Sequence, residues 1–330
     1  NEEWKLKTIG IIGTGAYGLG ISLSLLKKCD NIHMWVESKE RCEFLNNNKK
    51  SANILPNIEI PDNIDFSTDY EYILKSSNII FIAVSAKFID PVTKEIAKYN
   101  IKNKHFCILS KGIEQNSCAF VTDVFKRNIK TKNVSVISGP SFAIDVANNM
   151  PIGLSLASKN NKTMSIIKRV LSNDRIKLRT TTDVIGVELC GSIKNVIAIA
   201  SGILEGLGYT ESTRSFLITE SLHDIKSLIY GLGGNKKTIL SFAGVGDLLL
   251  TATSTKSRNY SYGILVGKKE FDKAKKYLET NTVEGYYTLH SIYQLIKKKK
   301  IDMPIINLIY DIIINNKEPE KLAEFLIKKD

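Results

Sequence analysis

The chain has 330 residues, is 43% hydrophobic and 24% charged, and carries 46 Lys and Arg against 34 Asp and Glu. The length predicts two domains, and the ordinary apolar and charged fractions exclude a disordered, collagen-like or coiled-coil protein. The net charge of +12 leaves nucleic acid, anionic membranes and small anionic substrates open as partners. A scattered lysine-rich surface that only aids solubility is the alternative explanation of this charge.

The first part of the chain alternates short apolar runs with helical stretches. Strands are predicted at residues 7–13, 31–36, 78–84, 105–109, 134–137, 152–156 and 176–178. A helix is expected at residues 18–26, and Pro140 and Pro151 bracket an expected loop. Uniformly apolar strands between helices are typical of a mainly parallel sheet covered on both faces. Residues 1–183 therefore form the first predicted domain, of the α/β class.

After about residue 183 almost every segment has helical periodicity. Helices are predicted at residues 184–204, 213–230, 287–297 and 303–314. Runs of lysine lie on or beside them, and we interpret these runs as solvated helix surface. Residues 184–330 are therefore predicted to form a second, all-α domain.

Other classes of site find little support in the sequence. The five cysteines form no C-x-x-C pair and the four histidines show no ligand spacing, which predicts the reducing cytoplasm and no metal site. Lys or Asp interrupts each candidate membrane segment, so no membrane span is expected, and residues 1–7 carry no apolar signal core. The sequence contains no basic stripe with interleaved aromatic residues, so nucleic-acid binding is not predicted.

A glycine-rich turn follows the first predicted strand. Gly13, Gly15 and Gly18 form a G-x-G-x-x-G pattern between an apolar strand and a helix. The first glycine permits a tight turn, the second lets a pyrophosphate approach the backbone, and the third lets the helix pack on the strand. The pattern and its context predict a dinucleotide-binding site, with the helix N-terminus facing the phosphates.

An acidic residue follows the second predicted strand. Glu37 lies 24 positions after Gly13, near where a carboxylate accepts a hydrogen bond from a ribose 2′-hydroxyl. Because a carboxylate repels a 2′-phosphate, Glu37 favours NAD over NADP, although a plain surface position is the alternative. Lys39 and Arg41 are near enough in sequence to complicate this prediction.

Two further segments follow predicted strands and are therefore expected at the ligand-binding edge of the sheet. Lys111 lies in Ser110-Lys111-Gly112, and a lysine in a surface loop is the alternative interpretation. Ser138-Gly139-Pro140-Ser141-Phe142-Ala143 exposes backbone donors and hydroxyls, unless it is only a structural turn.

The helical half contains charges in unusual surroundings. Lys194, followed by Asn195, lies in a helix that is apolar on nearly all sides and is therefore expected to be buried. A buried lysine is costly unless paired or functional, and burial suits it to proton transfer; snorkelling to the surface is the alternative. Asp247, between glycines and leucines, is its predicted partner. Ser257-Arg258-Asn259 offers a hydroxyl, a guanidinium and an amide for a small phosphate.

Together these motifs resemble the NAD(P)-dependent sn-glycerol-3-phosphate dehydrogenase family of the soluble bacterial type, over nearly the whole chain. Further matching segments are Gly186-Val187-Glu188, Gly191 to Val196, Gly244-Val245-Gly246-Asp247-Leu248 and Val283-Glu284-Gly285. The resemblance implies an N-terminal Rossmann-type α/β domain with a mainly parallel sheet, an all-α C-terminal domain and a site between them. It also implies a homodimer, and reversible hydride transfer between NAD(P)H and dihydroxyacetone phosphate that gives sn-glycerol 3-phosphate.

The resemblance also implies roles for individual residues. Lys194 matches the proton donor and acceptor, Asp247 its acidic neighbour, and Lys111 a residue that reaches substrate and cofactor. The candidate cofactor-binding residues are Gly13, Gly15, Ala16, Tyr17, Gly18, Glu37, Lys111, Ala143, Arg258 and Glu284. The candidate substrate-binding residues are Lys111, Gly139, Ser141, Lys194, Asn195, Asp247, Thr251, Ser257, Arg258 and Asn259.

This chain departs from the family pattern at several positions. They are Ser85, Asp145, Ser212 and Glu220-Ser221. None removes the proposed lysine or phosphate clamp. Glu37 stands where bacterial members often carry Arg or His, so NAD is the preferred cofactor and NADP stays possible. The alternatives are a 3-hydroxyacid or 6-phosphogluconate dehydrogenase, and a nucleotide-sensing or polyanion-binding protein that kept the fold without catalysis.

Overall fold

The computed structural model describes residues 6–330, which divide into two compact units. Unit 1 comprises Asn1–Lys111 and Val121–Val184, of which residues 1–5 are not described. Unit 2 comprises Gly112–Phe120 and Ile185–Asp330. The two units are therefore not two continuous stretches of sequence.

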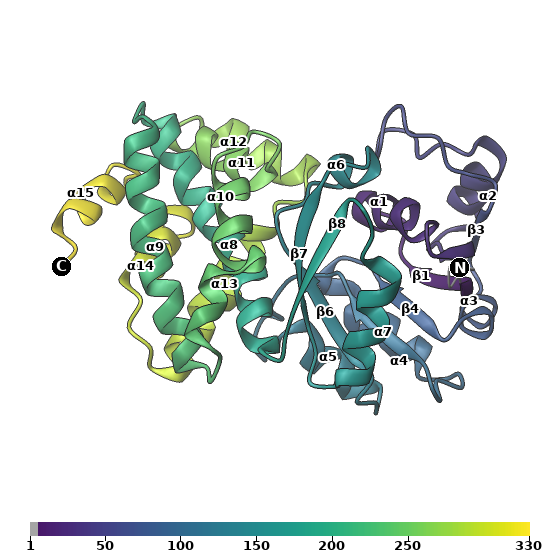
Figure 1. Cartoon of the computed structure of the whole chain (residues 1–330). Helices are drawn as coiled ribbons and strands as arrows, with labels where there is room; N and C mark the ends of the chain where they lie inside the picture. Colours follow the sequence, from purple (N-terminus) through teal and green to yellow (C-terminus); the bar gives the residue numbers. More distant parts are fainter. Residues whose placement is uncertain (1–5) are drawn as a thin grey trace. The chain divides into compact units, whose positions relative to one another are not determined.

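Unit 1 is built on one sheet of eight strands (Figure 1). The strands are β1 Leu6–Ile12, β2 Cys29–Trp35, β3 Ile64–Ser67, β4 Ile79–Ile82, β5 His105–Ile108, β6 Val134–Ser138, β7 Ile152–Ala157 and β8 Ile176–Thr181. Their spatial order is β3-β2-β1-β4-β5-β6-β7-β8, and every neighbouring pair is parallel except β6 and β7. The strand order reverses between β1 and β4, and ligands of such sheets bind beyond the carboxyl ends of the strands at this reversal.

Helices cover both faces of this sheet. They are α1 Ala16–Leu25, α2 Lys39–Asn48, α3 Tyr70–Ser76, α4 Ile89–Ile96, α5 Val121–Asn128, α6 Ala143–Ala147 and α7 Asn161–Leu171. α1 packs against α6 and α7, α4 packs against α5, and α3 packs on β1, β2 and β3. Because both faces are covered, β4, β5 and β6 are buried along their whole length.

The predicted α/β class and mainly parallel sheet are confirmed, and the elements that the sequence did not indicate include one strand and a helix in a segment expected to be a loop. The strand β3, at the sheet edge, alternates buried and partly exposed residues over only four positions, too short a pattern to predict a strand. The predicted loop between Pro140 and Pro151 contains the short helix α6.

Unit 2 is helical, as predicted (Figure 1). Its helices are α8 Val184–Gly206, α9 Glu211–Gly231, α10 Asp247–Ala252, α11 Arg258–Gly267, α12 Phe271–Thr280, α13 Glu284–Lys299, α14 Pro304–Ile313 and α15 Lys321–Lys328. A 3₁₀ turn, Lys236–Leu240, is followed by a π-helical turn, Phe242–Gly246, which leads directly into α10. This connection places Asp247 at the first position of α10.

The long helix α8 is the centre of unit 2. By length and composition alone it could cross a membrane, although no membrane span was expected from the sequence. However, 89% of its most apolar stretch is buried inside the structure. Burial among other helices is what a helix that is hydrophobic on all sides requires in a globular unit. We therefore interpret α8 as a core helix.

Glycines bring α8 and α11 into close contact. A side chain at Gly202 or Gly206 of α8 would collide with the backbone of α11. A side chain at Gly263 or Gly267 of α11 would collide in turn with the backbone of α8. The two helices therefore pack backbone against backbone at these four glycines.

The segment Gly112–Phe120 leaves the sheet of unit 1 and joins unit 2. Ile113 and Phe120 form an isolated β-bridge across it. The Ser291 hydroxyl on α13 donates to the Ile113 carbonyl over 2.8 Å, and the Asn116 amide donates to the Gln294 side chain over 2.8 Å. These bonds to α13 explain why the segment belongs to the helical unit.

Candidate active site

The turn between β1 and α1 has the geometry that its glycines predict. Gly13 has φ +114°, and a Cβ there would lie 2.6 Å from the Ala83 carbonyl oxygen. A Cβ at Gly18 would lie 3.0 Å from the Ala83 Cβ, whereas one at Gly15 would meet nothing within 4 Å. Gly13 and Gly18 therefore let the turn fit beside β4, and Gly15 leaves open space over the backbone.

The open space lies at the N-terminus of α1. Gly15 is the N-cap of this helix, and the first turn carries no acidic side chain. The first N–H groups of a helix have no partner within the helix and carry a partial positive charge. A pyrophosphate fits this position, because its oxygens can accept from those donors where no Cβ intervenes. These features of the chain fit a dinucleotide.

Three predicted residues of unit 1 meet at the carboxyl edge of the sheet. The hydroxyl groups of Tyr17 on α1 and Ser141 after β6 lie 2.9 Å apart. Lys111, which follows β5, places its Nζ 5.8 Å from the centroid of the Tyr17 ring. Ser141 also donates to the Gly139 carbonyl over 3.2 Å. Segments far apart in the sequence thus bring hydroxyls and a cation together, and Ala143 begins α6 beside them.

Of the two bases that follow Glu37 in the sequence, Lys39 and Arg41, the structure places Arg41 beside it. The Glu37 side chain, 60% exposed, lies 3.9 Å from the Arg41 Nε. Arg41 also donates from Nη2 to the Thr14 carbonyl oxygen over 2.7 Å, inside the glycine-rich turn. The Ser38 hydroxyl caps α2 by accepting from the Arg41 amide, which directs this residue back towards the turn. An acid and a base therefore lie together beside the glycine-rich turn.

In unit 2 the predicted ion pair between Lys194 and Asp247 is present. The Lys194 Nζ on α8 lies 2.5 Å from the Asp247 Oδ2 on α10, and the two side chains are 10% and 2% exposed. The Thr251 hydroxyl, one turn further along α10, donates to the Asp247 Oδ1 over 3.3 Å. A carboxylate this buried needs such partners, because an unpaired buried charge is strongly destabilising.

Next to the ion pair lies a buried amide network. The Asn259 Nδ2 on α11 donates to the Asn195 Oδ1 on α8 over 3.1 Å, and the Asn259 Oδ1 accepts from the Gly285 amide over 2.8 Å. A Cβ at Gly285 would lie 2.5 Å from the Asn195 carbonyl oxygen, so the start of α13 fits there only as glycine. Glu284 is the first residue of that helix. The network ties three helices together, and no sequence pattern predicted these contacts.

The remaining predicted residues lie at the N-terminus of α11. The Ser257 hydroxyl caps the helix by accepting from the Tyr260 amide over 3.3 Å, so it serves the helix as well as any ligand. Arg258, the first residue of α11, is exposed, whereas Asn259 is 8% exposed. A guanidinium at a capped helix N-terminus is suited to binding a phosphate.

The two sets of residues support complementary chemistry. The turn of unit 1 offers backbone donors to a dinucleotide, and unit 2 offers a buried ammonium beside a carboxylate and a guanidinium. This combination indicates the class of dinucleotide-dependent dehydrogenases. Within residues 6–330, no three His, Cys, Asp or Glu side chains gather in a way that could hold a metal ion.

Comparison with known proteins identifies the family within that class. Family models match residues 8–164, described as the NAD-dependent glycerol-3-phosphate dehydrogenase N-terminus, and residues 183–324, described as its C-terminus. The chain belongs to this family of NAD(P)-dependent oxidoreductases.

Individual proteins agree over the full length of the chain. A relative from Thermoanaerobacter sp., named glycerol-3-phosphate dehydrogenase (NAD(P)+), is 34% identical over 323 residues, which cover 98% of this chain and 97% of the relative. One of the same name from Staphylococcus epidermidis is 32% identical over 329 residues, covering 98% and 99%. The crystal structure of glycerol-3-phosphate dehydrogenase from Coxiella burnetii superposes with a TM-score of 0.90 at 29% identity, covering 98% and 99%.

Proposed function

We propose that the protein catalyses reversible hydride transfer between NAD(P)H and dihydroxyacetone phosphate, giving sn-glycerol 3-phosphate, with Lys194 as its proton donor and acceptor. This reaction links glycolysis to glycerophospholipid synthesis. The observation that carries the proposed residue roles is the buried ion pair of Lys194 and Asp247. A buried ammonium held by a carboxylate is costly to maintain as scaffold, and proton transfer to an alkoxide gives it a use.

Each residue of unit 2 has a proposed part. Arg258 and Asn259 bind the substrate phosphate, with Ser257 beside them, through charge-assisted hydrogen bonds. The Lys194 ammonium donates to the C2 carbonyl oxygen, polarises it, and transfers its proton as the alkoxide forms. Asp247 stabilises the charged lysine and fixes its direction, and Thr251 and Asn195 hold Asp247 and Asn259 in turn. In the reverse direction the neutral Lys194 removes the proton from the C2 hydroxyl.

Unit 1 is proposed to hold the dinucleotide. When bound, the nicotinamide supplies or accepts the hydride at C2. The turn at Gly13, Gly15 and Gly18 binds the pyrophosphate, and Ala16, Tyr17 and Ala143 line its surroundings. Lys111 contacts both substrate and cofactor, and Gly139 and Ser141 contact the substrate. Arg258 and Glu284 are the proposed cofactor contacts from unit 2.

NAD is the proposed preferred cofactor, and NADP stays possible. Glu37 follows β2, where a carboxylate accepts from a ribose 2′-hydroxyl and repels a 2′-phosphate. The neighbouring Arg41 offsets part of that repulsion, which supports a preference rather than an exclusion of NADP. Measured kcat/KM values for NADH and NADPH test this assignment, and a clear preference for NADPH would contradict it.

The test of the activity is a spectrophotometric assay of NADH and NADPH oxidation with dihydroxyacetone phosphate. We expect turnover with dihydroxyacetone phosphate and much slower turnover with 3-hydroxyacids or 6-phosphogluconate run in the oxidative direction. Dinucleotide binding without turnover of any of these substrates would instead favour a sensing protein. We further propose a cytoplasmic homodimer, which light scattering coupled to size-exclusion chromatography tests for the assembly.

A further inference from the structure

Unit 1 contains a pocket of about 610 Å³ that none of the proposed active-site residues lines. Its lining residues are Thr122, Lys126, Thr131, Lys132, Val134, Ser135, Lys159, Asn160, Asn161, Lys162 and Val184. Val134 and Ser135 are the first two residues of β6, whereas Ser138 ends that strand and is followed by Gly139 of the proposed active site. β1 and β6 run in the same direction, and the glycine-rich turn follows the carboxyl end of β1. The pocket therefore lies at the amino ends of the strands, opposite to the ends that carry the glycine-rich turn.

Every charged residue that lines the pocket is a lysine. They are Lys126 on α5, Lys132 before β6, and Lys159 and Lys162 around the start of α7, and no acidic side chain lines the pocket. Like charges on the walls of a concave surface add their potentials and concentrate anions there. Lys162 also acts on the protein beneath it: burial, and then the charge of Lys162, lower the pKa of His105.

These lysines differ from many others of the chain in having no carboxylate partner. Lys27, Lys75, Lys94 and Lys98 of unit 1 each pair with an acid within 2.8 Å. Within residues 6–330, none of the four pocket lysines lies within ion-pair distance of an Asp or Glu. Four ammonium groups in one pocket repel each other, and a bound anion would relieve that repulsion.

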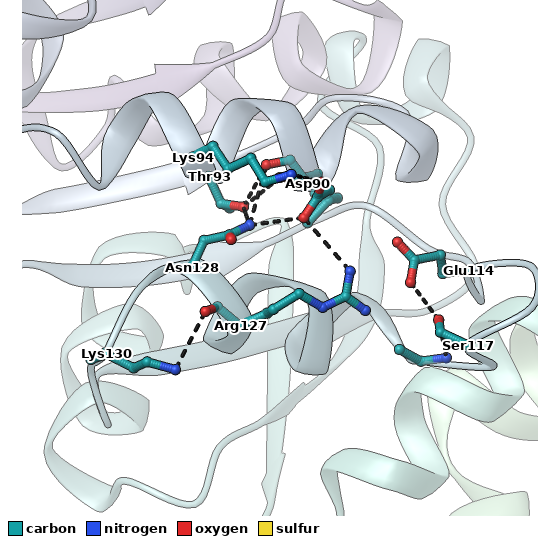
Figure 2. A network of polar contacts seen from close by, with 10 residues as sticks. Asp90, Thr93, Lys94, Glu114, Ser117, Arg127, Asn128 and Lys130 are labelled. Atoms are coloured by element: carbon teal, nitrogen blue, oxygen red, sulfur yellow. Dashed lines mark hydrogen bonds and ion pairs between the residues drawn. The ribbon is translucent and has the colours of Figure 1, made fainter.

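The helix α5 shows the contrast between adjacent residues. Arg127 places its Nη1 3.6 Å from the Asp90 Oδ1 on α4, and Asn128 donates to the same carboxylate over 2.9 Å (Figure 2). These residues are used to bind α5 to α4. Lys126, which precedes them, lines the pocket instead. The positive charge at the pocket is therefore not part of the network that holds these helices together.

The uncharged residues that line the pocket could contact the organic part of a ligand. Thr122, Thr131, Asn160 and Asn161 supply hydroxyl and amide groups, and Val134 and Val184 supply aliphatic surface. Asn160 is held in place, since its Oδ1 accepts from the Thr163 amide and its Nδ2 donates to the Asn133 side chain. A volume of about 610 Å³ is in the range of small-molecule sites and exceeds the needs of one inorganic ion.

We propose that this lysine-lined pocket binds a phosphorylated organic anion of about mononucleotide size, at a site separate from the active site. Two or more phosphate groups supply the charge that four lysines neutralise, because each phosphate carries about −1.5 to −2 near neutral pH. The apolar walls receive the organic part. This proposal does not depend on the reaction that the enzyme catalyses, since it concerns residues of unit 1 outside the active site.

The experiment is a calorimetric titration of the full chain with ATP in about 0.15 M salt, where exposed long-range charge effects are screened. Saturating NADH and sn-glycerol 3-phosphate are present, so that the active site is occupied but cannot turn over. We expect ATP to bind under these conditions. We expect Lys132→Gln with Lys162→Gln to weaken its binding by about tenfold or more, since each lysine is expected to make a charge-assisted contact.

The matched control removes two charges elsewhere. Lys275→Gln with Lys276→Gln lies on α12, where both lysines are exposed and neither lines the pocket, and we expect ATP binding within about twofold of the parent. Equal weakening by both double variants would reduce the effect to net charge and overturn the proposal. So would the loss of ATP binding when NADH and sn-glycerol 3-phosphate are present. Lys126→Gln with Lys159→Gln, on other walls, provides a second test whose expected loss is also about tenfold.

Discussion

The glycine-rich turn of unit 1 and the buried ion pair of unit 2 differ in how their charged or polar groups are satisfied. At the turn, Gly15 has no side chain and nothing within 4 Å of its Cβ position, so backbone donors are left for a ligand. In unit 2, Lys194 and Asp247 satisfy each other almost completely out of solvent. The backbone donors of the turn are suited to a negative charge that a ligand brings, whereas the ion pair holds both of its charges within the protein.

The difference has consequences for stability. A substitution at the turn that fits the backbone can impair binding and leave the fold intact, because no buried group loses a partner. A substitution in the ion pair affects both binding and fold, because the remaining charge stays buried. The same contrast separates the exposed Arg258 from its buried neighbour Asn259 on α11. Mutations can therefore distinguish the two kinds of site.

The largest effect is expected for Lys194→Met. Loss of the group that stabilises the forming oxyanion and donates the proton should lower kcat by about 100- to 1,000-fold. Removing one partner of a buried pair should also cost about 3–5 kcal/mol of unfolding free energy. Steady-state kinetics and urea denaturation measure the two effects separately.

The control combines Lys194→Met with Asp247→Asn, which removes the unpaired charge. We expect the double variant to regain part of the lost stability and none of the activity. Near-normal turnover in Lys194→Met would overturn the assignment of Lys194 as the proton donor. Recovery of turnover together with stability in the double variant would make the role of this lysine structural.

The next effect concerns two neighbours on α11. Arg258→Ala should raise KM for dihydroxyacetone phosphate by about 10- to 100-fold, since a hydrogen bond to a charged group contributes about 1.5–3 kcal/mol. Its melting temperature should hardly change, because the side chain is exposed. Asn259→Ala should lower the melting temperature by several degrees, since it leaves the Asn195 Oδ1 and the Gly285 amide without a buried partner. Equal melting temperatures for the two variants would contradict the proposed contrast.

A smaller effect is expected at the turn. Gly15→Ala should raise the Kd for NADH by about tenfold, because the methyl group takes the space through which a pyrophosphate approaches the backbone. Its stability should match that of the parent, since the added Cβ meets nothing. Gly13→Ala is the contrasting variant: its φ of +114° and the Ala83 carbonyl oppose a side chain, so unfolding should become easier by at least about 1–2 kcal/mol. Fluorescence titration and thermal melting test both.

Sequence reasoning succeeded where a single segment carried the whole signal. β4 and β5 are short, mostly apolar runs that are buried along their whole length, and each was predicted from its own residues. Lys194 was predicted to be a buried, paired residue because it interrupts an apolar helix. Asp247 was predicted to be its partner because it too lies among apolar residues and glycines. In both cases the physical constraint, burial, applies to the segment itself and leaves a local pattern.

The rest depended on packing between distant segments. The Asn195, Asn259 and Gly285 network joins three helices whose residues are up to 90 positions apart, and no local pattern indicates that the two amides contact each other. The contact of Arg41 with Thr14 depends on the direction in which α2 starts. The segment Gly112–Phe120 joins unit 2 through bonds to α13, about 178 residues further along the chain. No local periodicity records such contacts.

The smallest effect is expected at Glu37. This residue is charged, as the buried ion pair is, but its side chain is exposed. Glu37→Gln removes the charge that disfavours a 2′-phosphate and leaves Arg41 beside it. We therefore expect the ratio of kcat/KM for NADPH to that for NADH to rise by about threefold to tenfold, with stability unchanged, because exposed ion pairs contribute only about 0–1 kcal/mol. Glu40→Gln, an exposed acid one turn along α2, is the matched control and should leave the ratio unchanged. If both variants shift the ratio equally, the selectivity arises from the general field of the surface, and the carboxylate of Glu37 has no specific part in choosing the cofactor.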